Sequence, residues 1–255
     1  MRASMLVTAG AVLVLVGCGP ATPSTPDSGE VGGGITVFAA ASLTETFTRL
    51  GEDFEAANPG TEVRFNFAAS SALARQLGQG APADVFASAA PANMKQVTDT
   101  GAVTDTPTTF ARNKLAIAVP KGNPGKIAGL ADFAVADRKI ALCAEQVPCG
   151  AASRKVFDAA KVTPAPDTLE QDVKAVLTKV TLGEVDGALV YRTDVRAAGG
   201  EVEGIDFAEA GQAVNDYPIA PVAQARNAAT AKAFVAFVLS DRGRSVLDQA
   251  GFVLP

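Results

Sequence analysis

The segment ITVFAAASLTE, residues 35–45, contains the pattern that decides the fold. Its first five residues, ITVFA, form a short and mainly apolar run, which predicts a buried strand. Ser42 and Glu45 then have the spacing of a capping box, in which a serine at the N-cap and a glutamate three residues later open a helix. A strand that passes directly into a helix is the first half of a β-α-β unit, and such units build sheets that are covered by helices.

Strands and helices alternate through the rest of the chain. Val63, Phe65 and Phe67 alternate with polar residues as a strand, and Ser70 or Ser71 opens the helix that follows. Further apolar strands are predicted at 85–88, 115–119, 140–142 and 188–191, and helices around 173–180 and 234–247. This order predicts an α/β fold of two moderate lobes, each with a mostly parallel sheet and helices on both faces.

The residue counts exclude several kinds of site. The 255 residues include 22 Lys and Arg, 27 Asp and Glu, and no His, which rules out a Ser-His-Asp triad, a Cys-His pair and a His-ligated zinc site. No side chain has an ordinary pKa between about 5 and 8, so we expect ligand affinity to be nearly flat over that pH range. The acidic balance argues against nucleic acid as a partner. GxGxxG, P-loop and GxSxG motifs are absent, which leaves dinucleotide, nucleoside triphosphate and α/β-hydrolase functions without support.

The first 34 residues are predicted to lie outside the fold. The apolar run Met5–Val16 is too short to span a bilayer, which needs ~20 residues, and it suits a secretory signal peptide. The sequence LVGC at 15–18 resembles a bacterial lipobox, which implies removal of residues 1–17 and lipidation of Cys18. Residues 18–34, rich in Gly, Pro, Ser and Thr, then form a flexible tether. We expect an exported protein, lipid-anchored to the outer face of the bacterial cytoplasmic membrane. An ordinary signal peptide with an incidental cysteine is the alternative.

Ser42 and Ser70 each stand where a predicted strand gives way to a helix. Ligands of open α/β sheets bind at this edge, because free N–H groups and the positive end of the helix dipole favour an anion there. Alanines nearby leave room for a ligand to approach the backbone. Helix capping alone explains each serine taken singly, whereas the two together indicate an anion site.

Short motifs in a fixed order give the chain a resemblance to the bacterial molybdate-binding proteins of ABC transporters. The motifs are TVFAAASLT (36–44), FAASSALARQ (67–76), GAPADVF (80–86), VPCG (147–150), QDV (171–173), LVYRTD (189–194) and YPI (217–219). The resemblance extends from about residue 35 to the end. It implies the fold of a type II periplasmic binding protein, with two α/β lobes, a hinge and an interlobe ligand cleft.

The resemblance also implies where the lobes and the hinge lie and what the protein does. Lobe 1 would comprise 35–113 plus 223–255, and lobe 2 would comprise 114–222, with hinge strands at about 114–119 and 217–222. The protein would be a monomeric solute-binding protein and not an enzyme. It would capture molybdate, and tungstate as well, and deliver it to an ABC transporter permease, with no cofactor and no metal beyond the oxyanion.

In this family neutral donors hold the oxyanion. The matching positions are Ser42 and Ser70 with hydroxyl and amide, Cys149 and Val173 with the amide, and Tyr191 with the hydroxyl. The local sequence disagrees at Val173, because a capping box beginning at Thr168 would leave the amide of residue 173 already bonded within the helix. Binding through this amide requires the helix to begin later, with Asp172 near the N-cap. We predict this later start, as the family resemblance implies.

Cys149 departs from the family, which often has alanine there. Cys143 lies six positions earlier, and an exported protein folds in an oxidising compartment. We therefore hypothesise a Cys143–Cys149 disulfide beside the ligand. Two free thiols are one alternative, and a metal pair, which lacks further soft ligands, is the other.

Other functions remain open at this point. A protein of the same fold could bind sulfate, phosphate or a ferric complex, and an Arg-lined site with Arg75 as its candidate would support this. An exported enzyme is a remote alternative, because Cys149 lacks a His partner and no motif marks Asp172 and Asp194 as an acid/base pair. A structural lipoprotein would not need the serine and amide donors. A pocket of N–H and O–H donors suits a fully deprotonated dianion such as molybdate, whereas a protonated phosphate leaves one donor facing another.

Overall fold

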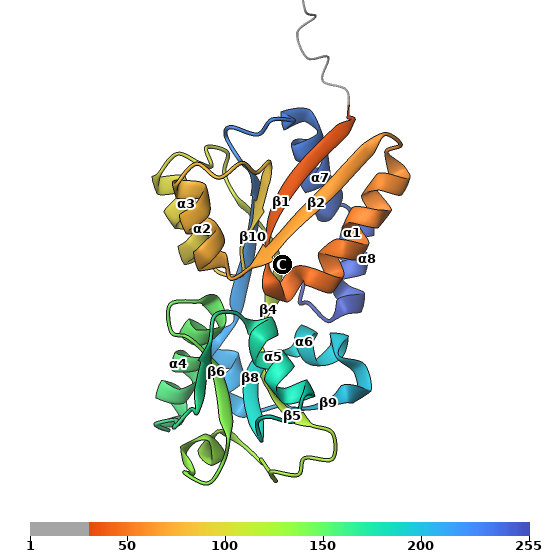
Figure 1. Ribbon diagram of the computed structural model, residues 1–255. Coiled ribbons are helices and arrows are strands. Elements are labelled where there is room, and N and C mark those ends of the chain that lie inside the picture. The colour runs from red at the N-terminus through yellow and green to blue at the C-terminus, as the bar shows by residue number, and fades with distance from the viewer. Residues whose placement is uncertain (1–30) are drawn as a thin grey trace, which may run out of the picture.

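The computed structural model describes residues 31–255. The expected signal peptide (1–17), Cys18 and most of the tether lie outside the described residues. Within the described part, two five-stranded sheets stand one above the other in Figure 1, each flanked by helices. No helix in residues 31–255 is long and apolar enough to cross a bilayer.

The first sheet has the strand order β2-β1-β3-β10-β4. Its strands are β1 (Gly33–Ala40), β2 (Thr61–Ala68), β3 (Val85–Ala87), β4 (Thr108–Asn113) and β10 (Asn215–Pro221). Its helices are α1 (Thr44–Ala57), α2 (Ser70–Gly78), α3 (Pro91–Asp99), α7 (Ala228–Leu239) and α8 (Asp241–Ala250). Alternate residues of β1 face opposite sides of the sheet, so that Val37 joins the core under α1 and α7 while Phe38 joins the core under α2 and α3. Helices therefore cover both faces, as the sequence predicts.

The second sheet has the order β7-β6-β8-β5-β9. Its strands are β5 (Leu115–Pro120), β6 (Ile140–Cys143), β7 (Thr168–Glu170), β8 (Gly187–Tyr191) and β9 (Val202–Ile205). Its helices are α4 (Pro148–Ala160), α5 (Val173–Thr181) and α6 (Arg192–Ala197), with 3-10 turns η2 (Leu130–Ala134), η3 (Gly199–Glu201) and η4 (Ala208–Ala213).

Each sheet combines two parallel with two antiparallel strand pairs. The prediction of mostly parallel sheets is therefore wrong, because half of the strand pairs in each sheet are antiparallel. The reason lies in the two crossings of the chain. β5 enters the second sheet from β4, and β10 returns to the first sheet from η4, so both strands run against their neighbours.

The two lobes contact each other along their facing ends. Ala41 and Ala69 of the first lobe belong to the apolar core of the second lobe. At the first crossing, the buried Asn113 donates a hydrogen bond from Nδ2 to Oγ1 of Thr193 at 2.8 Å. In the first lobe, Phe54 and Phe234 pack edge to face at 5.4 Å and fix α1 against α7. The start of α1 is thereby held at the boundary between the lobes (Figure 1).

Candidate functional site

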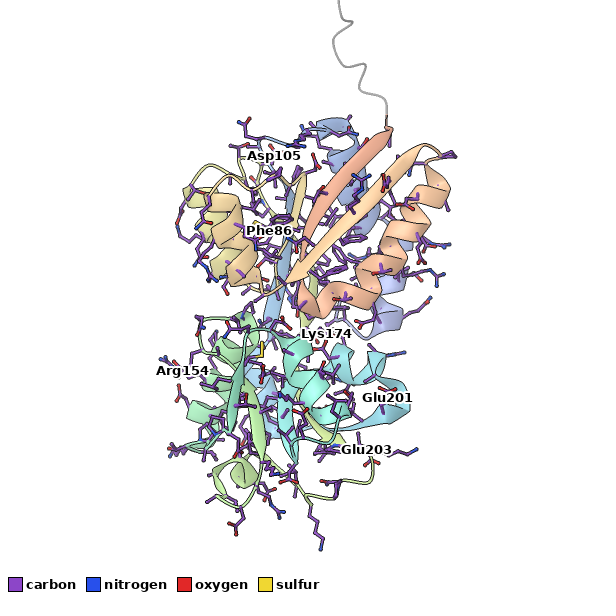
Figure 2. All side chains as sticks on the ribbon, in the orientation of Figure 1. Phe86, Asp105, Arg154, Lys174, Glu201 and Glu203 are labelled. Atoms are coloured by element: carbon purple, nitrogen blue, oxygen red, sulfur yellow. A yellow bond between two sulfur atoms is a disulfide. The ribbon has the colours of Figure 1, made fainter. Side chains whose placement is uncertain are left out.

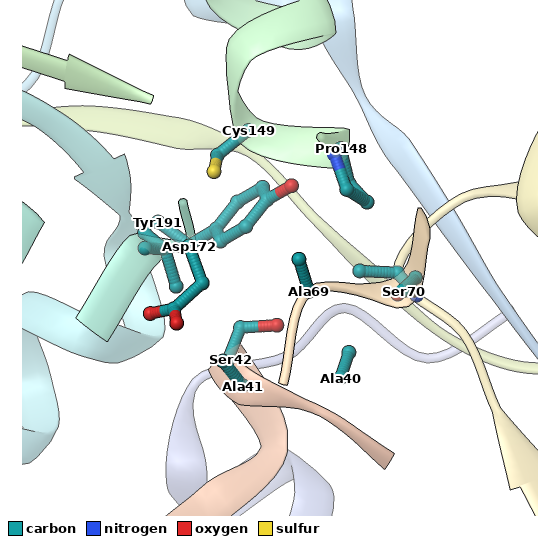
Figure 3. A pocket seen from close by; sticks show the side chains of 11 residues that line it. Ala40, Ala41, Ser42, Ala69, Ser70, Pro148, Cys149, Asp172 and Tyr191 are labelled. Atoms are coloured by element: carbon teal, nitrogen blue, oxygen red, sulfur yellow. Dashed lines mark hydrogen bonds between the residues drawn. The ribbon is translucent and has the colours of Figure 1, made fainter. Parts of the chain in front are cut away.

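A small pocket lies where the two lobes meet, and residues of both lobes line it (Figure 3). The lining residues are Ala40, Ala41, Ser42, Ala69, Ser70, Ala89, Pro148, Cys149, Asp172, Val173 and Tyr191. All five residues that the family resemblance implies for the ligand are in this set. The structure thus brings together side chains and amides that are up to about 150 positions apart in the chain.

Ser42 reaches the pocket by a different local structure from the one predicted. It lies in the 3-10 turn η1 (Ala41–Leu43), which precedes α1, and no side chain caps either element. The capping box expected between Ser42 and Glu45 is therefore wrong, because the extra turn separates the serine from the start of the helix. The Ser42 hydroxyl instead shares a hydrogen bond of 2.9 Å with the hydroxyl of Tyr217.

Ser70 is the first residue of α2, which confirms the predicted helix start. The earliest backbone bonds of this helix run from Ala72 and Leu73 to the carbonyl of Ala69, so the amide of Ser70 lies ahead of the helix's own hydrogen bonds. The Ser70 hydroxyl is fully buried and accepts a hydrogen bond of 2.9 Å from the amide of Ala89.

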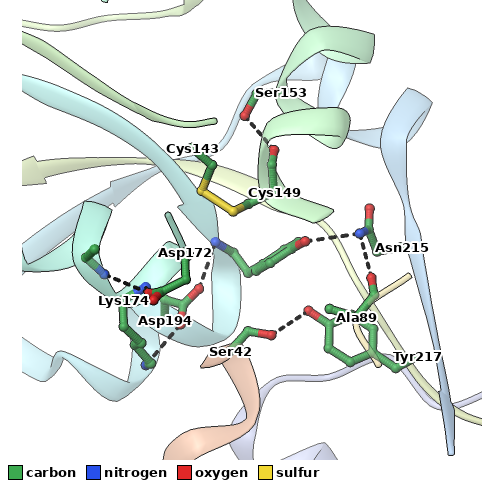
Figure 4. Close-up of a disulfide and its surroundings, with 12 residues drawn as sticks. Ser42, Ala89, Cys143, Cys149, Ser153, Asp172, Lys174, Asp194, Asn215 and Tyr217 are labelled. Atoms are coloured by element: carbon green, nitrogen blue, oxygen red, sulfur yellow. Dashed lines mark hydrogen bonds and ion pairs between the residues drawn. A yellow bond between two sulfur atoms is a disulfide. The ribbon is translucent and has the colours of Figure 1, made fainter. Parts of the chain in front are cut away.

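Cys149 lies in the first turn of α4, directly after Pro148 at the first helical position. A proline is tolerated there because its missing N–H would have no partner within the helix. Cys149 forms a disulfide with Cys143 at the end of β6, as hypothesised from the sequence (Figure 4). The backbone of the turn is also tightly packed, because a Cβ on Gly150 would lie 2.0 Å from the carbonyl oxygen of Ala144. Disulfide and glycine together hold the start of α4 in place.

Val173 is the first residue of α5, and Asp172 is its N-cap. One carboxylate oxygen of Asp172 accepts hydrogen bonds from the amides of Lys174 and Ala175 at 2.8 and 3.0 Å. The competing capping box that would begin at Thr168 is wrong, because residues 168–170 form β7. The amide of Val173 is therefore left for a partner outside the helix, as the family resemblance requires.

Tyr191 ends β8 and is 1% exposed. Its hydroxyl accepts a hydrogen bond of 3.0 Å from Nδ2 of Asn215, and the same nitrogen donates to the carbonyl of Ala89 at 2.7 Å (Figure 4). Burial raises the pKa of the Tyr191 hydroxyl well above its ordinary value, and burial does the same for Tyr217 against the hydrogen bond from Ser42. Both hydroxyls consequently keep their hydrogen.

The sequence reasoning missed three residues beside the pocket. Tyr217 is one of only two tyrosines and part of the YPI motif, but the family resemblance places it only in the hinge. Asn215 and Ala89 carry no motif of their own, and only the fold shows that they contact Tyr191 and Ser70. No signal in the sequence could have identified them.

The charged groups near the pocket are few. Among residues 31–255, Asp172 is the only charged residue that lines the pocket. Arg75, the candidate for an Arg-lined site, is exposed and does not line it. Lys174, labelled in Figure 2, pairs with Glu45 of α1 at 2.8 Å and with Asp194 of α6 at 3.0 Å. Burial lowers the pKa of Lys174, but the two carboxylates outweigh it and hold this pKa above its ordinary value. The lysine is thus a fixed cation between the lobes.

Asp194 is completely buried, and its carboxylate accepts a hydrogen bond of 3.0 Å from the amide of Tyr191. Burial raises the pKa of Asp194 to about 6 against the attraction of Lys174. The sequence contains no side chain with an ordinary pKa between about 5 and 8, and burial supplies one in Asp194. That ligand affinity is nearly flat over this pH range stays a prediction.

Replacing Asp194 by Asn is expected to change how stability depends on pH. The folded-state pKa is above the ordinary one, so the contribution of this group to stability is full below about pH 4 and is lost as the pH rises through 6. The loss is roughly 3 kcal/mol for about two pKa units. Between pH 4 and pH 7, the free energy of unfolding of D194N should therefore rise by up to that amount relative to that of the wild type. Urea denaturation at both pH values measures the free energy of unfolding of each protein. If D194N differed from the wild type by the same amount at both pH values, the prediction would be contradicted.

Comparison with known proteins identifies the family and the fold. Residues 35–253 match the family described as bacterial extracellular solute-binding protein. The chain is 44% identical over 252 residues to the molybdate-binding protein ModA of Mycobacterium tuberculosis, covering 98% of this chain and 97% of that protein. Among solved structures, the periplasmic molybdate-binding protein of Azotobacter vinelandii aligns with a TM-score of 0.75 at 20% identity, covering 87% of this chain and 99% of that one. The sulfate-binding protein SubI of M. tuberculosis aligns with a TM-score of 0.76 at 18% identity, covering 87% and 86%, so the fold alone does not select the oxyanion.

Proposed function

Since the chain belongs to the bacterial extracellular solute-binding proteins, and within them to the molybdate-binding proteins, we propose that it captures molybdate outside the cytoplasm and delivers it to an ABC transporter permease. The observation that carries the proposal is the pocket itself. Ser42 and Ser70 from one lobe face Cys149, Val173 and Tyr191 from the other across it. Its role is to bind and release a solute, and we propose no catalysis and no cofactor.

The proposed site holds a dianion by dipoles rather than by cations. The first turns of α2, α4 and α5 all reach the pocket, and each presents amides that its own helix does not use. The hydroxyls of Ser42, Ser70 and Tyr191 add neutral donors. Donors fixed in a buried cleft stabilise an anion without the reorganisation that water would need. An oxyanion with every oxygen deprotonated can accept from all of them.

Asp172 opposes the anion, because its negative charge lies in the pocket lining. Asn caps a helix as well as Asp does, so D172N removes the charge and keeps the start of α5. At ~8 Å in water, a unit charge and a dianion repel by roughly 1 kcal/mol. D172N is therefore expected to raise molybdate affinity about fivefold, as measured by titration calorimetry. An unchanged or lower affinity would show that the carboxylate does not oppose the ligand.

Calorimetric titration with molybdate, tungstate, sulfate and phosphate tests the proposed function directly. We expect molybdate and tungstate to bind and phosphate to bind far more weakly. Preference for sulfate or phosphate would favour another oxyanion-binding protein of the same fold. If none of the four anions binds or raises the melting temperature, the protein is not an oxyanion carrier and a structural lipoprotein becomes the better explanation.

Three further parts of the proposal concern organisation and location. The lobes would follow the limits given above, 35–113 plus 223–255 and 114–222, except that β10 (Asn215–Pro221), expected in lobe 2 and its hinge, pairs within the sheet of the first lobe. The protein would act as a monomer. Cys18 would carry the lipid anchor. Replacing Cys18 by Ser should then release the protein from the membrane fraction of the cells, and retention there would contradict the anchor. Among residues 31–255, no three His, Cys, Asp or Glu side chains cluster as a metal site would require.

A further inference from the structure

Two hydroxyls of the pocket each accept a hydrogen bond from a protein group that can only donate. The Ser70 hydroxyl accepts from the amide of Ala89 at 2.9 Å. The Tyr191 hydroxyl accepts from Nδ2 of Asn215 at 3.0 Å (Figure 4). A hydroxyl has a single hydrogen, and neither of these bonds uses it. These two bonds therefore leave the hydrogen of each hydroxyl unused, and both hydroxyls line the same pocket.

The orientation of the Asn215 amide follows from its second contact. The atom 2.7 Å from the carbonyl oxygen of Ala89 must be the nitrogen, because a carbonyl can only accept. The same nitrogen faces Tyr191, so both of its hydrogens are used and Tyr191 receives one of them. Asn215 begins β10, which belongs to the first sheet, while Tyr191 ends a strand of the second. Asn215 thus ties the hydroxyl of one lobe to the backbone of the other.

We propose that Asn215 is a positioning residue that fixes the Tyr191 hydroxyl as a hydrogen-bond donor to the oxyanion and thereby disfavours oxyanions that carry a proton. This inference rests on the proposed function. Hydrogen phosphate presents an O–H that needs an acceptor, and a Tyr191 oxygen already bonded by Asn215 is a poor one. Molybdate needs donors only. Asn215 touches no ligand in this scheme and acts through Tyr191.

The test compares molybdate with inorganic phosphate at pH 8 in the full-length protein. Asn215→Asp has nearly the same shape, but its carboxylate can only accept, so Tyr191 would donate to it and turn its lone pairs toward the ligand. Asn215→Leu removes the donor without adding charge. Both anions are dianions at this pH, so the ratio of their affinities cancels the effect of the new charge in N215D. Phosphate affinity is obtained by competition against molybdate.

We expect both variants to shift the affinity ratio toward phosphate by about fivefold, which corresponds to one hydrogen bond. In a Tyr191→Phe background the hydroxyl is gone, and N215D should shift the ratio less than threefold. The matched control is Asp216→Asn on the next residue of the same strand, whose side chain pairs with Arg112 at the surface, and it should leave the ratio within twofold.

The outcomes separate the two proposals. A shift below threefold in both variants, or an equal shift with and without the Tyr191 hydroxyl, overturns the role of Asn215 while leaving the molybdate function intact. Absence of molybdate binding by the wild type overturns the proposed function and this inference with it. A shift of threefold or more that depends on Tyr191 supports the inference, since a merely structural asparagine would weaken both anions alike.

Discussion

Replacing Val173 by proline is expected to weaken molybdate binding by about 10- to 150-fold. A hydrogen bond to a charged group contributes about 1.5–3 kcal/mol, and proline deletes the amide that we assign to the oxyanion. The helix itself should tolerate the change, because Val173 is the first residue of α5 and proline suits that position. Asp172 before it already has the extended backbone that precedes proline, with φ −158° and ψ 172°.

The matched control for this substitution is Val173→Ala. Alanine also shortens the buried side chain but keeps the amide, so V173A should bind molybdate within about threefold of the wild type. Titration calorimetry measures both affinities, and thermal melting checks that both variants are folded. Equal affinity of V173P and V173A would show that this amide does not bind the ligand.

Replacing Gly150 by alanine is expected to have the largest effect on stability. The new Cβ would lie 2.0 Å from the carbonyl oxygen of Ala144 and 2.8 Å from that of Cys143. The disulfide between Cys143 and Cys149 holds the two sides of this turn together, so neither can easily retreat. Overpacking of this kind lowers the free energy of unfolding by about 3 kcal/mol or more. The melting temperature should fall by roughly 6–12 °C, and molybdate affinity should fall with it.

Gly78 provides the control for Gly150. It also lies in a helix, at the end of α2, but a Cβ there would have no atom within 4 Å. Because alanine favours the helical backbone over glycine, G78A should leave the melting temperature unchanged or raise it slightly. If G150A melted at the same temperature as G78A, the close approach at the start of α4 would not constrain the turn.

Local sequence signals predicted the elements well and the details of their ends less well. Strand β1 and the start of α2 at Ser70 follow from apolar runs and a serine, which act over a few residues. The capping box at Ser42 failed because a 3-10 turn separates it from α1, and nothing in the residue types distinguishes the two arrangements. At α5 two capping signals competed, and pairing of residues 168–170 with β6 decided for Asp172. That pairing is a tertiary contact, which the local pattern does not contain.

The composition of the site could be predicted only through the family resemblance. The serines alone indicated an anion site, but Val173 has no functional side chain, and its role depends on where a helix starts. Asn215 could not be found from local patterns, and Asp194, although it belongs to the LVYRTD motif, could not be assigned its role. Both depend on partners that only the fold brings close. The same holds for the pKa of Asp194. Burial raises it to about 6, whereas no side chain in the sequence has an ordinary pKa near that value.

Lys174 has one carboxylate partner in each lobe, and this bears on how the cleft opens. Any separation of the lobes breaks its pair with Glu45, whereas its pair with Asp194 moves with the second lobe. The buried carboxylate consequently keeps its cation in both arrangements, and of the two ion pairs only the partly exposed one with Glu45 is lost. Such pairs contribute about 0–1 kcal/mol, and salt weakens them. This ion pair therefore contributes little to holding the lobes together, and least of all at high salt.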